Sequence, residues 1–303
     1  KHYVGVAWYQ KKVTIPADWK GERITLFLER PHIETTVWVN QQELGMQNSL
    51  CVPHVYDLTA ATTPGKTYLI TIRIDNRIKE INVGPDSHSI TDQTQGNWNG
   101  IVGRIELQAT PKVHLEDIQV YPDLSNQKAL VRMNIRSASS TKGEITLSAA
   151  SFNTDIQHKV APVHQSFFIR PGDNPVEMEL PMGKEFLTWD EFSPALYKLT
   201  AKLTNGKQTD TQQVQFGMRD FKIEGKWFYV NGRKTMLRGT VENCDFPLTG
   251  YAPMDVASWE RVFRICRNYG LNHMRFHSFC PPEAAFIAAD LVGFYLQPEG
   301  PSW

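Results

Sequence analysis

The chain has 303 residues, a length that allows about two or three domains with substantial apolar cores. Its 32 basic and 32 acidic side chains leave a formal net charge of +0, so charge gives no reason to expect nucleic acid or an anionic membrane as partner. The four cysteines are widely spaced without a CxxC pair, which argues against a metal knuckle or a dense disulfide framework. No apolar run approaches the ~18 residues of a membrane-spanning helix.

Residues 1–110 are predicted to form a β-sandwich, specifically a jelly roll. In segment 67–75, TYLITIRID, apolar and polar residues alternate, which is the period of a half-buried strand. Segments 23–29 (RITLFLE) and 35–40 (TTVWVN) behave in the same way. Many short strands without a strong helical stretch are typical of sandwiches and jelly rolls.

Residues 111–217 are predicted to form a second β-unit. Segment 130–137, LVRMNIRS, alternates apolar and polar residues, and the Asn205-Gly206 pair predicts a hairpin turn. About seven strands in roughly 105 residues favour an immunoglobulin-like sandwich. No residue pattern in this segment indicates chemistry, so we expect it to act as a spacer.

Residues 218–303 have a different pattern. A hairpin is predicted at Asn231-Gly232, followed by a strand that ends near residue 242. A helix is predicted within 254–270, with Asp255 as its N-cap and Gly270 just beyond its end. Strand, helix, strand, helix and strand then indicate parallel βαβ units.

The βαβ units at the C-terminal end supply only three parallel strands. A (β/α)₈ TIM barrel needs eight strands and typically about 250 residues, and a short parallel sheet would leave a strand edge unpaired. We therefore expect the chain to be a fragment of a longer protein whose barrel is incomplete here.

Several motifs, in order, resemble glycoside hydrolase family 2. Segments AWYQKKVTIPADWKGERITLFLERPHIETTVWVNQQELG and NWNGIVGRIEL resemble its sugar-binding jelly roll. Segments WDEFSPALYKL and FGMRDFKIEGKWFYVNGRKTMLRG resemble its immunoglobulin-like domain and the junction to its barrel. Segment GLNHMRFHSFCPPEAAFIAADLVGFYLQPEGPSW resembles its second and third barrel strands.

The resemblance implies a retaining exo-glycosidase that acts on terminal β-linked sugars. Two carboxylates about 5–5.5 Å apart act as acid/base and nucleophile in such enzymes. In the family these glutamates follow the fourth and seventh barrel strands, so we expect no catalytic residue in this chain and no turnover by it alone. β-Galactosidase is the first expectation, with β-glucuronidase and β-mannosidase next. The resemblance implies a carbohydrate partner, no cofactor or metal in the chemistry, and a periplasmic or secreted location.

The resemblance also implies substrate-binding roles for residues near the ends of the second and third barrel strands. Arg275 matches an arginine beside the nucleophile, although a structural ion pair within the barrel is the alternative. His277 could contact a sugar hydroxyl, but the family order is Ser-His where this chain has His-Ser. Glu299 matches an acidic group at the pocket floor. His273 and His277 lie four residues apart on a strand without an intervening glutamate, which disfavours zinc.

Three further residues are predicted to contact substrate. Asp245 follows the first barrel strand, although it could equally cap a loop. Trp303 could stack on a pyranose or pack in a core. Asp92 lies in a long polar loop, SHSITDQTQGNWNG, and long loops are uncommon unless functional, although an ordinary surface loop is the alternative.

Two other classes of protein fit parts of the sequence. One is a non-catalytic carbohydrate-binding protein built from two sandwiches, and the other is a structural or adhesive β-protein. The βαβ segment separates these hypotheses from the enzyme, because an adhesin has no use for strands that end in polar groups.

Overall fold

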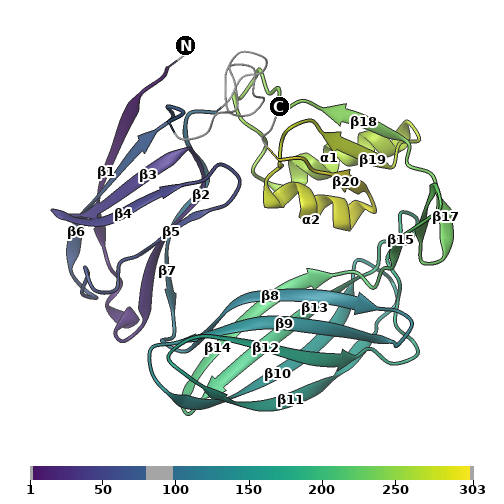
Figure 1. Cartoon of the computed structure of the whole chain (residues 1–303), viewed down its shortest axis with the longest axis horizontal. Coiled ribbons are helices and arrows are strands. Elements are labelled where there is room, and N and C mark those ends of the chain that lie inside the picture. Colours follow the sequence, from purple (N-terminus) through teal and green to yellow (C-terminus); the bar gives the residue numbers. More distant parts are fainter. Residues whose placement is uncertain (1–2, 80–97, 301–303) are drawn as a thin grey trace.

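The computed structural model describes residues 3–79 and 98–300, and these form three consecutive units (Figure 1). The first sandwich contains β1 to β7, the second sandwich contains β8 to β14, and the C-terminal unit contains β15 to β20 with helices α1 and α2. The molecule is therefore mainly β, with several separate sheets, as the alternating sequence patterns predict.

The first sandwich packs a four-stranded sheet, ordered β1-β6-β3-β4, against a three-stranded sheet, ordered β5-β2-β7. Its elements are β1 (Val6–Thr14), a short 3-10 helix (Ala17–Trp19), β2 (Arg23–His32), β3 (Glu34–Val39), β4 (Gln42–Asn48), β5 (His54–Asp57), β6 (Thr67–Asp75) and β7 (Gly100–Thr110). The apolar faces of the two sheets meet in one core, as the period-two pattern of segment 67–75 requires.

Strand β6 also buries a charge that the alternation places on the outer face. Ile70, Ile72 and Ile74 are buried as predicted, but the side chain of Asp75 is completely buried as well. Its carboxylate pairs with Arg73 at 2.9 Å and with Arg77 at 2.7 Å. Burial of this carboxylate is tolerated because its charge is met by several cations.

The second sandwich also has seven strands, the number that the sequence predicts. One sheet has the order β11-β10-β13-β14 and the other β12-β9-β8. The strands are β8 (His114–Asp123), β9 (Lys128–Ser137), β10 (Thr141–Phe152), β11 (Lys159–Ile169), β12 (Gly172–Pro181), β13 (Leu196–Asn205) and β14 (Gln208–Phe216). The hairpin between β13 and β14 turns at Gly206-Lys207, one residue later than predicted, because Asn205 still pairs with Gln208.

The C-terminal unit begins with an antiparallel sheet, β15-β16-β17, and continues with a parallel sheet, β18-β19-β20. Its elements are β15 (Phe221–Glu224), β16 (Trp227–Val230), β17 (Arg233–Thr235), β18 (Gly239–Glu242), α1 (Val256–Asn268), β19 (His273–Phe276), α2 (Glu283–Val292) and β20 (Tyr295–Gln297). Asn231-Gly232 forms the predicted hairpin turn, with φ of 51° and 75°.

Helix α1 has the predicted ends. The Asp255 carboxylate accepts a hydrogen bond from the backbone N–H of Ser258, which satisfies one of the unpaired donors of the first turn. Gly270 follows the C-cap with a φ of 79°. Neither described helix has the length and apolarity that a membrane crossing demands.

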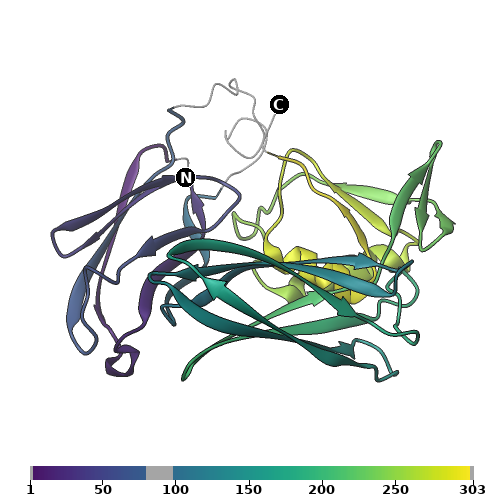
Figure 2. The ribbon, with the colours of Figure 1, turned by 60° about the horizontal axis from the view of Figure 1, so that its bottom comes forward.

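The C-terminal unit contacts both sandwiches (Figures 1 and 2). Ile33, Leu50 and Trp98 of the first sandwich share a buried cluster with Cys244 and Phe279 of the C-terminal unit. On the other side, the indole N–H of Trp189 donates to the backbone carbonyl of Asp290 on α2 at 2.8 Å. These contacts fix the parallel strands relative to both sandwiches.

Candidate functional site

The three parallel strands β18, β19 and β20 end side by side. The residues that directly follow each strand therefore lie at one edge of the sheet. Val241 on β18 pairs with Arg275 on β19, which in turn pairs with Gln297 on β20. Residues that follow these positions therefore meet, as they do at the carboxyl edge of a parallel sheet. The candidate site consists of Glu242, Arg275, His277, Ser278 and Glu299.

Arg275 and Glu299 form the centre of this site. The Arg275 Nε donates to Glu299 Oε1 at 2.6 Å, and the Nη2 donates to Oε2 at 3.1 Å. This is the bidentate geometry of a strong guanidinium–carboxylate pair. The side chains are 38% and 26% exposed, so the pair lies at the surface of the described unit and is accessible to solvent.

The loop after β19 adds a third donor to Glu299. The Ser278 backbone N–H donates to Glu299 Oε2 at 2.7 Å, and Ser278 has a φ of 50°. The Glu299 N–H in turn donates to the Phe279 carbonyl at 3.2 Å. The two loops therefore hold each other, and both carboxylate oxygens of Glu299 accept hydrogen bonds.

His277 lies against the same pair. Its Nδ1 is 3.3 Å from Arg275 Nη2 and 3.6 Å from Glu299 Oε2. Its backbone N–H donates to the Glu242 carbonyl at 2.9 Å, which ties the β19 loop to the end of β18. His277 thus lies beside Arg275 and Glu299, with Ser278 next to it in the chain.

The carboxyl groups of Glu299 and Glu242 have opposite electrostatic environments. The Ser278 N–H, followed by the Arg275 guanidinium, lowers the pKa of Glu299. Burial raises the pKa of Glu242, although the Cys244 N–H donates to its Oε1 at 2.8 Å. Glu299 is therefore held ionised, which makes it a poor proton donor.

The other predicted contacts stand apart from this centre or outside the described residues. Asp245 is exposed near Glu242, and its negative charge adds to the rise in the pKa of Glu242 that burial causes. Asp92 and Trp303 lie outside the described residues. Sequence reasoning did not select two members of the site, Ser278 and Glu242. Ser278 contributes through its backbone N–H, which no side-chain pattern marks. Glu242 directly precedes the loop in which Asp245 was predicted as the contact to the sugar.

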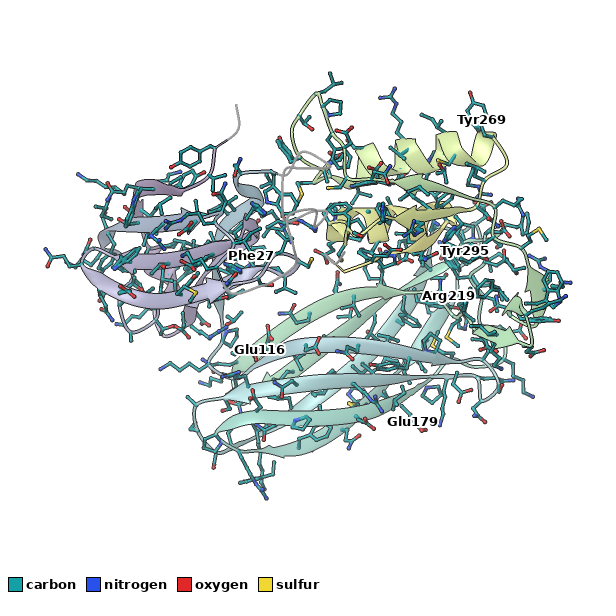
Figure 3. All side chains as sticks on the ribbon, turned by 45° about the horizontal axis from the view of Figure 1, so that its top comes forward. Phe27, Glu116, Glu179, Arg219, Tyr269 and Tyr295 are labelled. Atoms are coloured by element: carbon teal, nitrogen blue, oxygen red, sulfur yellow. The ribbon has the colours of Figure 1, made fainter. Side chains whose placement is uncertain are left out.

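A cavity of about 560 Å³ is lined mainly by residues of the C-terminal unit. Arg219, Phe228, Phe286 and Tyr295 are among its lining residues, and Figure 3 labels Arg219 and Tyr295, which lie near each other. Gln297 and Pro298 line it, whereas the charged pair of Arg275 and Glu299 does not. Among residues 3–79 and 98–300, no group of three or more His, Cys, Asp or Glu side chains could hold a metal ion.

Two family models match consecutive parts of the chain. Residues 1–111 match the sugar-binding domain of glycosyl hydrolases family 2, and residues 113–219 match a second model of glycosyl hydrolases family 2. The two matches together cover the first and second sandwiches and leave the C-terminal unit beyond their limits.

Sequence relatives extend the similarity over the whole chain. A β-glucuronidase of Paenibacillus borealis is 23% identical over 318 residues, which span 100% of this chain and 51% of the relative. A β-galactosidase of Thermoanaerobacter pseudethanolicus is 25% identical over 308 residues, which span 99% of this chain and 40% of the relative.

Solved structures have the same arrangement. A Bacteroides uniformis β-glucuronidase 2, covalently bound to cyclophellitol-6-carboxylate aziridine, matches with a TM-score of 0.83 and 19% identity. That match covers 99% of this chain and 37% of the solved one. A β-D-glucuronidase of Dictyoglomus thermophilum matches with a TM-score of 0.75 and 23% identity over 99% of this chain and 51% of the solved one. The chain thus spans about half or less of the length of these proteins.

Proposed function

Because the chain belongs to glycosyl hydrolase family 2, we propose that it is the N-terminal portion of a retaining exo-glycosidase that removes terminal β-linked sugars. In this proposal residues 1–110 are the sugar-binding jelly roll and residues 111–217 are the immunoglobulin-like domain. Residues 218–303 are the start of a TIM-barrel catalytic domain. The similarity of the chain to about half or less of each relative supports this assignment.

The observation that carries the proposal is the Arg275–Glu299 pair at the carboxyl edge of the parallel sheet. Active sites of barrel enzymes lie at that edge. A carboxylate that accepts from Arg275 and from the Ser278 N–H is ionised and oriented, so it suits the floor of a sugar pocket. Arg275 and His277 add donors beside it.

The two catalytic carboxylates of the proposed enzyme are not among these groups. A retaining enzyme needs one carboxyl group that gives up a proton and a second that attacks the sugar to form a covalent intermediate. Glu299 does not suit the first task, because its lowered pKa keeps it ionised. For the second task its oxygens would have to reach the sugar, and both already accept hydrogen bonds from Arg275 or from the Ser278 N–H. We therefore propose that this chain alone does not turn over substrate.

The preferred substrate class is a terminal β-galactoside. The charge of Arg275 is already balanced by Glu299. The pair therefore offers no free positive charge to the carboxylate of a glucuronide, which favours a neutral sugar. Asp245, Asp92 and Trp303 stay proposed contacts to the sugar.

The test compares this chain with the longer protein that contains it. Nitrophenyl β-galactoside and nitrophenyl β-glucuronide are offered to both, and ¹H NMR identifies the anomer that is released first. The proposal predicts turnover by the longer protein only, faster with the galactoside, with the β-anomer released first. Release of the α-anomer first, or clear turnover by the 303-residue chain that Glu299→Gln abolishes, would contradict it.

A non-catalytic carbohydrate-binding protein is the second candidate, supported by the match of residues 1–111 to a sugar-binding domain. Titration of the 303-residue chain with galactosides separates the two. Millimolar or tighter binding by this chain, together with no turnover by the longer protein, would favour the binding protein.

A further inference from the structure

Two cysteines from distant parts of the chain meet where the first sandwich packs against the C-terminal unit. Cys51 lies between β4 and β5, and Cys280 lies in the loop that follows β19. Both are partly exposed free cysteines. Cys51 packs against the buried cluster that contains Phe279, the residue before Cys280, and the two thiols are close enough to change each other's ionisation. The thiol of Cys280 also has a weak contact of 3.8 Å with the carbonyl of Pro281. The pair therefore bridges two units that are far apart in sequence.

A buried positive charge lies beside the two thiols. Arg30 on β2 is only 4% exposed, and its guanidinium lies 5.0 Å from the ring centroid of Trp98 and 5.2 Å from that of Phe279. Its Nη2 donates to the backbone carbonyl of Cys280, while in the part of the chain that the structure describes its Nε has no hydrogen-bond acceptor. A buried cation of this kind stabilises a negative charge placed nearby.

The two thiols differ in their tendency to ionise. The hydrogen bond from Cys51, aided by the charge of Arg30, lowers the pKa of Cys280 to about 6. The same hydrogen bond and burial raise the pKa of Cys51. Cys280 is thus the thiolate and Cys51 the thiol that keeps its proton, which is the division of roles in a reactive cysteine pair.

We propose that Cys51 and Cys280 are an oxidisable pair that forms a disulfide between the first sandwich and the loop of the candidate site. The oxidant is a small or protein disulfide. The Cys280 thiolate attacks one sulfur of the oxidant and releases the other as a thiolate. Cys51 then loses its proton and attacks Cys280, which releases the second half of the oxidant. Two protein thiols become one disulfide, and the oxidant disulfide becomes two thiols.

The proposed bond would stabilise the geometry at Glu299. Cys280 lies two residues after Ser278, whose N–H donates to Glu299, and directly after Phe279, whose carbonyl accepts from the Glu299 N–H. A covalent link to Cys51 fastens this loop to the first sandwich. Formation of this disulfide involves the two thiols alone and does not depend on glycosidase activity.

The experiment treats the folded 303-residue chain with excess glutathione disulfide at pH 7.5 and maps its peptides by mass spectrometry without reduction. We expect a cross-linked peptide that joins Cys51 to Cys280, with loss of two free thiols. We also expect the unfolding temperature to rise by about 5 °C, because the bond closes a very long loop, and to return after dithiothreitol.

Single variants test the assigned roles. Cys51→Ser leaves Cys280 without a resolving thiol, so the mixed disulfide with glutathione should accumulate on Cys280. Cys280→Ser should give neither the cross-link nor that adduct. Cys266→Ser, in α1, is the matched control and should cross-link as the unsubstituted chain does.

Alkylation of the folded chain by iodoacetamide provides a second readout that does not require cross-linking. Cys280 should react with a pH midpoint near 6, and Arg30→Gln should move that midpoint upward, towards an ordinary thiol near 8.5. Disulfides that involve Cys244 or Cys266 instead, or no cross-link together with an ordinary midpoint for Cys280, would overturn the inference.

Discussion

At the scale of single residues, the Arg275–Glu299 pair joins two strands of the parallel sheet through side chains. Replacement of Arg275 by Met removes both donors to Glu299 and should lower the free energy of unfolding by about 1 kcal/mol at pH 7, a modest value because the pair is partly exposed. Urea denaturation measures this difference. Arg275→Lys, which keeps the charge without the fork of donors, should lose less.

The same pair predicts a pH dependence of stability. The pKa of Glu299 is lowered in the folded protein, so its contribution is fully present above its unfolded pKa of about 4.3 and is lost as pH falls through the folded pKa. The difference in unfolding free energy between Arg275→Met and the unsubstituted chain should therefore shrink between pH 6 and pH 3. An equal difference at both pH values would show that Arg275 acts through packing alone.

Asp75 is the more buried of two carboxylates in an ion cluster of the first sandwich, which consists of Glu34, Arg73, Asp75, Arg77 and Lys79. Asp75→Asn leaves Arg73 and Arg77 facing an uncharged group and should destabilise the chain by about 3 kcal/mol, as measured by urea denaturation at pH 7. The cations lower the pKa of Asp75, first through the hydrogen bond from Arg77. Its contribution therefore begins to fall near pH 4 and declines further in acid.

A matched control for Asp75 is available on the surface. Asp173 pairs with Arg136 at 3.0 Å, but its side chain is 58% exposed. Asp173→Asn should change the free energy of unfolding by less than about 0.5 kcal/mol. Equal effects at Asp75 and Asp173 would refute the importance of burial.

At the scale of elements, helix α1 depends on a cap that the sequence predicts. Asp255→Ala removes the acceptor for the Ser258 N–H and should cost about 1 kcal/mol, whereas Asp255→Asn should cost much less because its side-chain oxygen can still accept. Thermal unfolding followed by circular dichroism compares the two variants. Equal losses would mean that the charge of Asp255, and not its hydrogen bond, stabilises the first turn.

Local sequence patterns predict elements whose physical cause is local. The alternation in 67–75, the turn at Asn231-Gly232 and the cap at Asp255 each depend on neighbours within a few residues, and each agrees with the structure. The turn after β13 was predicted one residue early, because two hairpin registers fit a Gly beside an Asn almost equally well.

At the scale of the whole molecule, the order of the units was predictable but their contacts were not. The burial of Asp75 and the role of the Ser278 backbone arise from partners that no local pattern marks. The same holds for the meeting of Arg30 with Cys280, which needs two units to pack together. For Arg275 an ion pair within the barrel was predicted only as an alternative and with no named partner, because no local pattern shows that Glu299 faces the arginine.

The most direct test of the central claim is to locate the nucleophile of the longer enzyme of which we propose this chain to be the N-terminal portion. A 2-deoxy-2-fluoro-β-galactosyl fluoride should trap the covalent intermediate of a retaining enzyme, and mass spectrometry of its peptides identifies the labelled carboxylate. The account predicts a label on a glutamate outside these 303 residues. A label on Glu242 or Glu299 would contradict it.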